Sequence, residues 1–315
     1  MKYLYFILFV ICIKFLSGQD VHFSQFATDR MNLNPSMIGN FTEYDSRFSI
    51  QRKSQWNSVS VPFSSFSSSY ERKNIFYNFN LGIQFLNDKS GDSKLSLHQI
   101  NLALSKSYNT LNLNNLSIGA LIGFSQKSID YTELIFEDEE QFLKNNFIYP
   151  DVGVGLSYKA FPNKILSYNF GISSFHLNKP NISFNEDENV KLHVKNNLYF
   201  GVEYDYLTNF TIIPEVVFTS QSMSNELIIG SQAEFTLENI KIIPFTYYRV
   251  EDAIIIGFGM MKDNLTTNIS YDVNISDLDI ASNNRGGFEF SIIYLWQKRK
   301  ERINKITEEV CPKFL

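Results

Sequence analysis

The sequence predicts an all-β protein, specifically an antiparallel transmembrane β-barrel of about 14 strands. The first observation is composition: the 315 residues include 29 Phe and 17 Tyr, and only 19% are charged. Aromatic residues favour strands. The second observation is a period-2 alternation of apolar and polar residues, and the third is an alternation of short and long connections. The net charge of −5 argues against a nucleic-acid partner, because such proteins are generally basic.

Residues 1–18 have the pattern of a secretory signal peptide. Lys2 is followed by the apolar run Tyr3–Ile13, which Lys14 interrupts, and the small residues Ser17 and Gly18 stand before the expected cleavage site. The run is short for a membrane-spanning helix, which needs about 20 apolar residues. We expect cleavage before Gln19 and export from the cytoplasm, which leaves Cys311 as the single cysteine of the mature chain.

Residues 19–43 precede the first predicted strand and show no clear strand pattern of their own. Two interpretations remain open at this point. The segment is either a plug that folds into the lumen of the barrel or a loose periplasmic leader.

Residues 44–297 are expected to form the outer-membrane barrel. Leu116–Phe124 and Val152–Ala160 show the alternation clearly, with apolar residues at every second position. The predicted strands have about the length that crosses an outer membrane. Pro214 and Pro244 fall inside predicted strands, where a bulge is expected because proline removes a ladder donor. The strands are predicted to begin near Tyr44, Phe63, Ile75, Leu95, Asn115, Asp151, Ser167, Val190, Phe210, Glu226, Ile240, Asp252, Leu265 and Gly287.

The connections between these stretches alternate in length. Long or polar ones are predicted at Asn87–Lys94, Gln126–Pro150, Asn178–Asn189 and Ile275–Gly286, and tight ones at Glu71–Asn74, Pro162–Leu166, Leu207–Asn209, Leu237–Asn239 and Lys262–Asn264. Outer-membrane barrels have short periplasmic turns and longer outer loops. An even strand number then places both termini in the periplasm, with residues 298–315 as a short periplasmic tail. A soluble β-sandwich is the alternative, since its strands alternate too.

Several short motifs stand out along the mature chain. They are Gln19–Phe26 (QDVHFSQF), Asn32–Ser36 (NLNPS), Arg52–Trp56 (RKSQW), Pro150–Gly155 (PDVGVG), Gly286–Glu289 (GGFE) and Cys311–Leu315 (CPKFL). Together they resemble one known family, the PorP/SprF outer-membrane proteins of the type IX secretion system in Bacteroidetes. The resemblance covers essentially the whole mature chain, and its most specific parts are the opening and closing motifs. In two places the chain departs from the common family pattern: Phe288 stands where a histidine is usual, and Ser36 where an alanine is usual.

The resemblance implies a non-enzymatic role in type IX secretion and gliding motility. Family membership implies an outer-membrane barrel that assists export or surface anchoring of a cognate secreted protein, such as a large adhesin with a C-terminal sorting domain. The implied partners are outer-membrane lipid, the translocon and the periplasmic ring and motor components. A passive porin or small-solute transporter is the alternative function, because both need a polar lumen.

The sequence offers little that could carry chemistry. The four histidines show no metal-ligand spacing, and there is no Gly-x-Ser-x-Gly turn. We therefore expect no catalytic residue, metal or cofactor. His193 lies beside Lys191 and is interpreted as either a lumenal ligand site or an ordinary polar lining residue. The candidate partner-binding residues are Arg52, Gln55 and Trp56, since exposed Trp and Arg are enriched at binding hot spots.

Overall fold

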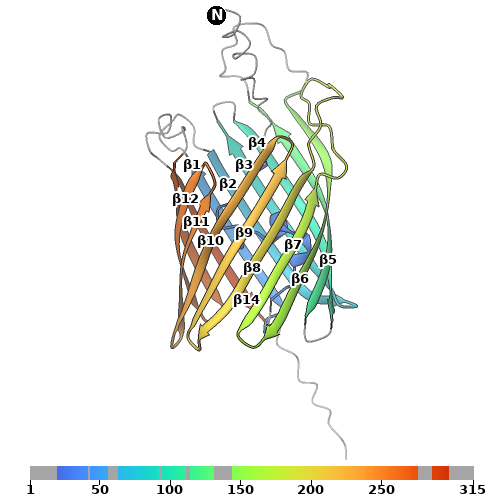
Figure 1. The fold of residues 1–315 in the computed structure, drawn as a ribbon. Helices are drawn as coiled ribbons and strands as arrows, with labels where there is room; N and C mark the ends of the chain where they lie inside the picture. The colour runs from blue at the N-terminus through green and yellow to red at the C-terminus, as the bar shows by residue number, and fades with distance from the viewer. Residues whose placement is uncertain are drawn as a thin grey trace, which may run out of the picture.

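A computed structural model of the chain shows a closed antiparallel barrel of 14 strands (Figure 1). The structure describes residues 20–41, 43–55, 63–91, 94–110, 114–130, 144–275 and 286–297. The predicted signal peptide, the C-terminal tail with Cys311, and Trp56 lie outside the described residues.

Each strand pairs with its sequence neighbours, and β1 pairs with β14 to close the sheet. The predicted fold class is therefore confirmed. The strands are β1 (Ser46–Gln55), β2 (Phe63–Phe76), β3 (Phe79–Ser90), β4 (Leu95–Asn109), β5 (Asn115–Ser128), β6 (Asn146–Asn163), β7 (Leu166–Phe175), β8 (Lys195–Leu207), β9 (Phe210–Gln221), β10 (Ser224–Leu237), β11 (Ile240–Arg249), β12 (Ala253–Lys262), β13 (Leu265–Asn274) and β14 (Gly287–Trp296).

The two ends of the barrel differ in their connections. The end at which β1 begins and β14 finishes carries tight turns such as 164–165, 208–209 and 263–264, and we call it the turn end. The opposite end carries the longest connections, including 129–145 and 176–194, and we call it the loop end. The predicted contrast in connection length is thus present, although the loop end also carries the two short connections 222–223 and 250–252.

Several predicted boundaries are wrong. The connection expected at Asn87–Lys94 spans only residues 91–94, and the strand expected from Asp151 begins at Asn146. The tight turn expected at Glu71–Asn74 lies at residues 77–78, because β2 continues to Phe76 through a register shift after Arg72. The strand expected from Val190 begins at Lys195, since the residues before it belong to a loop that has its own bridge, between Asn181 and Lys191. Alternating polarity continues into this loop, which is why it resembled a strand.

The bulges expected at the two prolines are absent from the pairing that the structure describes. Pro214 pairs with Ser231 and Pro244 with Phe258, without a register shift on that side. On the other side of each proline the ladder skips pairs and resumes in the same register. Because proline lacks only its own N–H, the sheet loses hydrogen bonds locally without gaining a residue.

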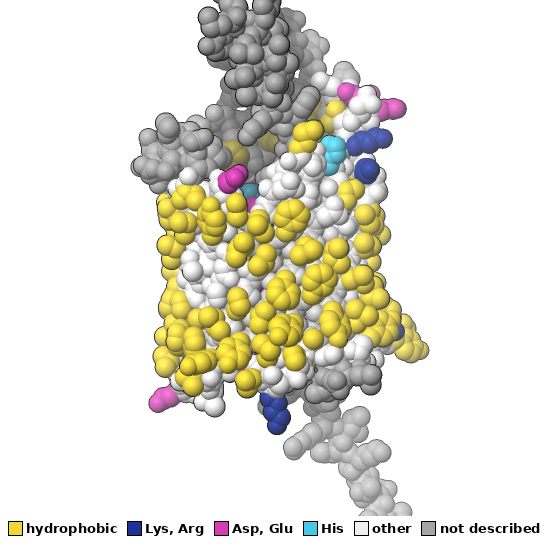
Figure 2. All heavy atoms as spheres, viewed as in Figure 1, with side chains coloured by type: hydrophobic (Ala, Val, Ile, Leu, Met, Phe, Trp, Pro, Cys, Tyr) yellow, Lys and Arg dark blue, Asp and Glu magenta, His cyan; other side chains and the backbone are white. Residues whose placement is uncertain are grey.

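Polar side chains lie inside the barrel and apolar side chains lie outside, the reverse of the arrangement in a soluble protein. The largest fully buried side chains include Arg47, Lys53, Gln51, Glu71 and Glu289, all on the inner face. Exposed large hydrophobic residues cover the outer wall, and Figure 2 shows them as a belt with charged side chains near the two ends. Among the described residues, no helix has the length and apolar character to span a bilayer. An apolar outside around a polar inside suits a membrane barrel, whereas a β-sandwich would bury its apolar face.

Residues 20–41, which we call the N-terminal segment, lie inside the barrel (Figure 1). The segment starts at the loop end, where the Asp20 amide donates to Gln221 at the end of β9. It contains the short helix α2 (Arg30–Leu33) and the 3₁₀ turn η1 (Pro35–Met37), and then leads to β1 at the turn end. The start of β1 and the end of β14 thus both lie at the turn end, whereas the described chain itself begins at the loop end.

Candidate functional site

The N-terminal segment and the inner wall that holds it form the candidate functional site. Glu289 on β14 holds the backbone of the segment at Ser24 and Gln25. The two carboxylate oxygens accept the backbone N–H groups of Ser24 and Gln25, each at 2.8 Å, and the Gln51 amide donates to the same carboxylate. The Gln25 side chain also donates to Ser270 on β13, at 2.9 Å. The wall therefore holds the backbone of the segment as well as its side chains.

A buried charge cluster surrounds the Ser24 hydroxyl. This hydroxyl donates to Asp272 at 2.6 Å and accepts from Lys53 at 3.0 Å and from Arg249 at 2.8 Å. Asp272 in turn pairs with Lys53 at 3.2 Å and with Arg249 at 3.3 Å. Removing one member of such a buried cluster leaves an uncompensated charge, which is strongly destabilising. The cluster joins β1, β11 and β13 to one serine of the segment.

A second buried ion pair holds the middle of the segment. Arg47 on β1 pairs with Glu71 on β2 at 2.6 Å and also donates to the Thr28 carbonyl at 2.8 Å. The second oxygen of Glu71 accepts the Gly39 N–H at 3.1 Å. One ion pair of the wall therefore binds the segment on both sides of α2.

The Asn34-Pro35 motif rests against glycines of the wall. The Asn34 amide donates to the main-chain carbonyls of Leu156 at 2.9 Å and Ile172 at 3.1 Å, on β6 and β7. A Cβ at Gly119 would lie 2.4 Å from the Pro35 carbonyl carbon, and a Cβ at Gly155 would lie 2.0 Å from the Asn34 side-chain oxygen. Non-bonded atoms do not lie so close. At Gly119 the contact would be with backbone, which cannot move aside easily, so the turn approaches the wall there because the position is glycine.

An acid–histidine group closes the loop end of the site. His176, which is almost fully buried, lies 2.6 Å from Asp20 and 2.9 Å from Asp151. Burial alone would lower the pKa of His176, but the Asp20 and Asp151 carboxylates raise it to about 9. Burial would raise the pKa of Asp20, but His176 and Lys195 together hold it below its ordinary value. At neutral pH the group is thus an ion pair that fastens the start of the segment.

Aromatic side chains pack beneath these polar contacts. The Phe26 ring lies 5.1 Å from the Tyr247 ring in an edge-on arrangement and 6.3 Å from that of Tyr199. Both tyrosine hydroxyls donate to Glu215, at 2.8 and 2.6 Å. The carboxylate is therefore satisfied by two hydroxyls, and the phenylalanine fills the apolar space between their rings.

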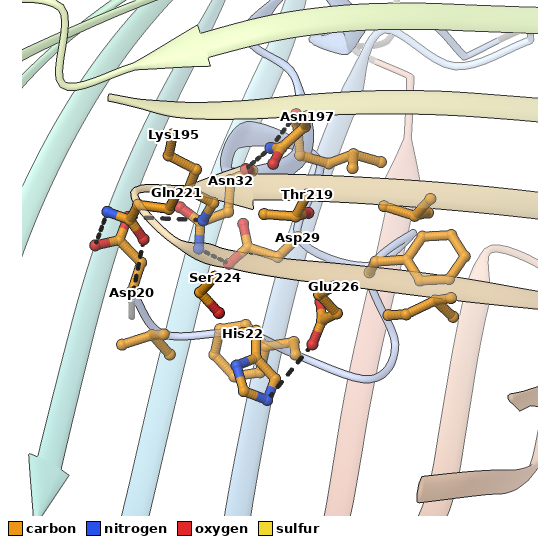
Figure 3. Close-up of a pocket in the computed structure, with 16 residues that line it drawn as sticks. Asp20, His22, Asp29, Asn32, Lys195, Asn197, Thr219, Gln221, Ser224 and Glu226 are labelled. Atoms are coloured by element: carbon orange, nitrogen blue, oxygen red, sulfur yellow. Dashed lines mark hydrogen bonds and ion pairs between the residues drawn. The ribbon is translucent and has the colours of Figure 1, made fainter. Parts of the chain in front are cut away.

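A small cavity of about 70 Å³ remains between the segment and β8, β9 and β10 (Figure 3). At one side of it Asp20, Lys195 and Gln221 gather, and His22 points toward Glu226, with 3.9 Å between nitrogen and oxygen. The cavity is too small for a large solute. Within the described parts of the chain, no cluster of His, Cys, Asp and Glu is placed to hold a metal ion.

Of the three predicted partner-binding residues, the structure describes Arg52 and Gln55, which lie on opposite faces of β1. Arg52 is exposed on the outer face of β1, two positions after the outward-facing Ile50. Gln55 lies on the opposite face, where its side chain covers Gly287 of β14. His193 also lies outside the strands, and its carbonyl accepts a hydrogen bond from Gln221. The alternating directions of side chains along β1 separate Arg52 from Gln55.

Sequence reasoning missed the residues that hold the segment. Glu289, Asp272, Lys53 and Arg249 lie far apart in the sequence, although Lys53 and Glu289 belong to the motifs Arg52–Trp56 and Gly286–Glu289. The available signal was the presence of charged residues at inward positions of otherwise apolar strands. Such a position in a barrel needs a partner, and the segment that precedes the first strand, if it is a plug, can supply one.

Comparisons with known proteins agree with this architecture. The chain resembles the solved structure of a Pseudomonas aeruginosa FadL homologue, with 8% identity, a TM-score of 0.52, and coverage of 84% of this chain and 93% of that one. It also resembles the CymD monoaromatic hydrocarbon channel, with 10% identity, a TM-score of 0.52, and coverage of 90% and 96%. These likenesses concern the barrel fold alone. No curated protein sequence matches the chain. The sequence model described as type IX secretion system membrane protein PorP/SprF matches residues 15–294, so the chain belongs to the PorP/SprF family.

Proposed function

We propose that this type IX secretion barrel assists export or surface anchoring of one cognate secreted protein, and that it is not an open pore. The proposed cargo is a large adhesin with a C-terminal sorting domain. The barrel would act beside the translocon and the periplasmic ring and motor components. The observation that carries the proposal is the N-terminal segment, which occupies the lumen and is held there by buried charged groups.

Three separate sets of contacts support a segment that stays in place. Glu289 and the Ser24 cluster hold its first part, Arg47 and Glu71 hold its middle, and the wall glycines receive its Asn34-Pro35 turn. Hydrogen bonds to charged groups contribute about 1.5–3 kcal/mol each. Withdrawal of the segment would leave several charges in the wall without these partners. A passive porin would have to bear that cost whenever it conducts.

The tight turns support an orientation. In barrels of this type short turns face the periplasm and long loops face outward. We infer that the turn end is periplasmic in the outer membrane, as predicted for the barrel termini. Asp20 would then lie at the outer mouth, where the segment can meet an exported protein.

Arg52 remains a proposed partner contact on the outer face. It is exposed near the loop end, and among the described residues it forms no ion pair with a carboxylate. Gln55 faces the lumen and would not share that surface. A charge reversal, Arg52→Glu, is expected to weaken capture of the cargo from outer-membrane fractions, whereas Lys262→Gln, at the turn end, should not.

Deletion of the gene and bilayer recording test the proposal together. We expect the deletion to remove one surface adhesin or motility trait while other type IX cargo is still exported. The purified full chain should show no steady conductance in planar bilayers. Unchanged surface display would refute the secretion role, and a steadily open pore in the unmodified protein would favour the transporter.

A further inference from the structure

The membrane-facing wall contains an apolar groove across β4 to β7, near the turn end. The groove has a volume of about 710 Å³. Small-molecule sites in proteins have volumes of about 300–1,000 Å³. Its outward-facing walls include Leu104, Ile118, Leu156 and Ile172, all exposed. A ligand here would contact the outside of the barrel. The N-terminal segment contacts the lumenal side of the same wall, where Gly119 and Gly155 separate the two.

Strand register explains why the wall is hollow at this place. Leu104, Ala120, Val154 and Ser174 are direct neighbours in one outward-facing row across the four strands. The next row toward the turn end, on β4 to β7, consists of Lys106, Ile118, Leu156 and Ile172. The short side chains of Ala120 and Ser174 leave a depression that their longer neighbours surround.

A lysine stands at the foot of the groove. The Lys106 ammonium lies 4.8 Å from the centre of the Phe79 ring and 5.5 Å from that of Tyr108. It forms no ion pair with any carboxylate in the described parts of the chain, and residues 111–113 of the next connection (Leu-Asn-Leu) contain no acidic residue. Cation–π contacts orient an ammonium group without neutralising it. A positive charge is therefore available at the edge of an apolar, membrane-facing groove.

The neighbouring β2–β3 turn extends the same surface. Phe76 and Tyr77 are 68% and 76% exposed, and their rings lie in an edge-on arrangement with 4.3 Å between centroids. Phe76 pairs with Phe79, which lines the groove. Figure 1 shows this turn projecting outward from the wall at the turn end. Exposed aromatic rings beside a lysine are typical of the level at which lipid head groups meet acyl chains.

We propose that this groove binds one anionic glycerophospholipid. One acyl chain lies along Leu104, Ala120 and Val154, and the phosphate accepts hydrogen bonds from Lys106. The Phe76-Tyr77 turn flanks the head group. Charge complementarity selects an anionic head group, while the apolar floor requires an acyl chain, so free phosphate would not suffice.

Native mass spectrometry of the full-length barrel tests the proposal. The protein is purified in detergent and given equal amounts of phosphatidylglycerol and phosphatidylcholine. We expect one retained phosphatidylglycerol in preference to phosphatidylcholine. Ala120→Phe, which fills the depression, should remove retention. Lys106→Gln should reduce the preference for phosphatidylglycerol about fivefold, the effect of one lysine at a charged lipid surface.

Matched variants outside the groove control for general changes to the wall. Thr267→Phe adds the same ring to an outward position of β13, and Lys262→Gln removes an outward lysine at the turn end of β12. Both should retain the lipid as the unmodified protein does. Equal retention by Ala120→Phe overturns the proposal, as does displacement of the lipid by inorganic phosphate alone. A dimer of the chain that Ala120→Phe abolishes would also overturn it, because the groove would then hold a second copy.

Discussion

Replacing Glu289 by glutamine tests how the barrel holds its N-terminal segment. The carboxylate offers two oxygens, one each to the Ser24 and Gln25 amides. A carboxamide offers only one oxygen and presents an NH₂ group at the other position, so one of the two N–H groups loses its acceptor. A hydrogen bond to a charged group contributes about 1.5–3 kcal/mol. We expect the segment to be held about 2 kcal/mol less tightly, while the strand ladder is unchanged.

Hydrogen exchange is the appropriate assay, because local opening can be measured without unfolding the barrel. A loss of about 2 kcal/mol corresponds to roughly 30-fold faster exchange of the peptide that contains Ser24 and Gln25. Glu234→Gln is the matched control, since Glu234 pairs with Lys241 on the wall and forms no hydrogen bond or ion pair with the described residues of the segment. Unchanged exchange in Glu289→Gln, or equal acceleration in the control, would refute the reasoning.

Three further perturbations probe other contacts of the segment. The raised pKa of His176 means that its ion pair with Asp20 stabilises the folded protein fully below about pH 6.5 and is lost as the pH rises through about 9. The hydrogen-exchange protection of residues 20–26, corrected for intrinsic rates, should therefore fall over that range. The variant His176→Gln should show no such fall. Gly119→Ala places a Cβ against the Pro35 backbone and should lower protection of residues 30–38 without preventing barrel assembly; normal protection would contradict the packing. Arg47→Met leaves a buried carboxylate unpaired and should cost about 3–5 kcal/mol in urea unfolding, and a loss below 1 kcal/mol would show that water reaches the site.

The sequence predicted the barrel because each strand carries its own evidence. In β5 every second side chain from Leu116 to Phe124 faces outward, as the alternation required. The boundaries of strands and turns were less predictable where the alternation of polarity in the sequence does not match the pairing of strands in the structure. Alternating polarity around Lys191 resembled a strand, although those residues form a loop with its own bridge. In the same way, a β-bulge was expected at Pro214, whereas the pairing of β9 with β10 and with β8 keeps its register at that residue.

The candidate site was predicted only in outline. A plug was one of two interpretations of residues 19–43, and no residue of the wall was assigned to hold it. Arg52 and Gln55 are close in sequence, but side chains that are an odd number of residues apart on a strand lie on opposite faces of the sheet. The pairing of Ser24 with Asp272 spans most of the chain, and no local pattern encodes it.

Period-2 polarity, strand length and connection length are local properties, and they determined the barrel class, the approximate strand number and the contrast between its two ends. Which inward charges meet which part of the N-terminal segment was decided only by tertiary structure. Closure of β1 on β14 brings Lys53, Glu289 and Asp272 around one serine. The physical reason is that register and curvature, which set the distances across a lumen, depend on all strands together.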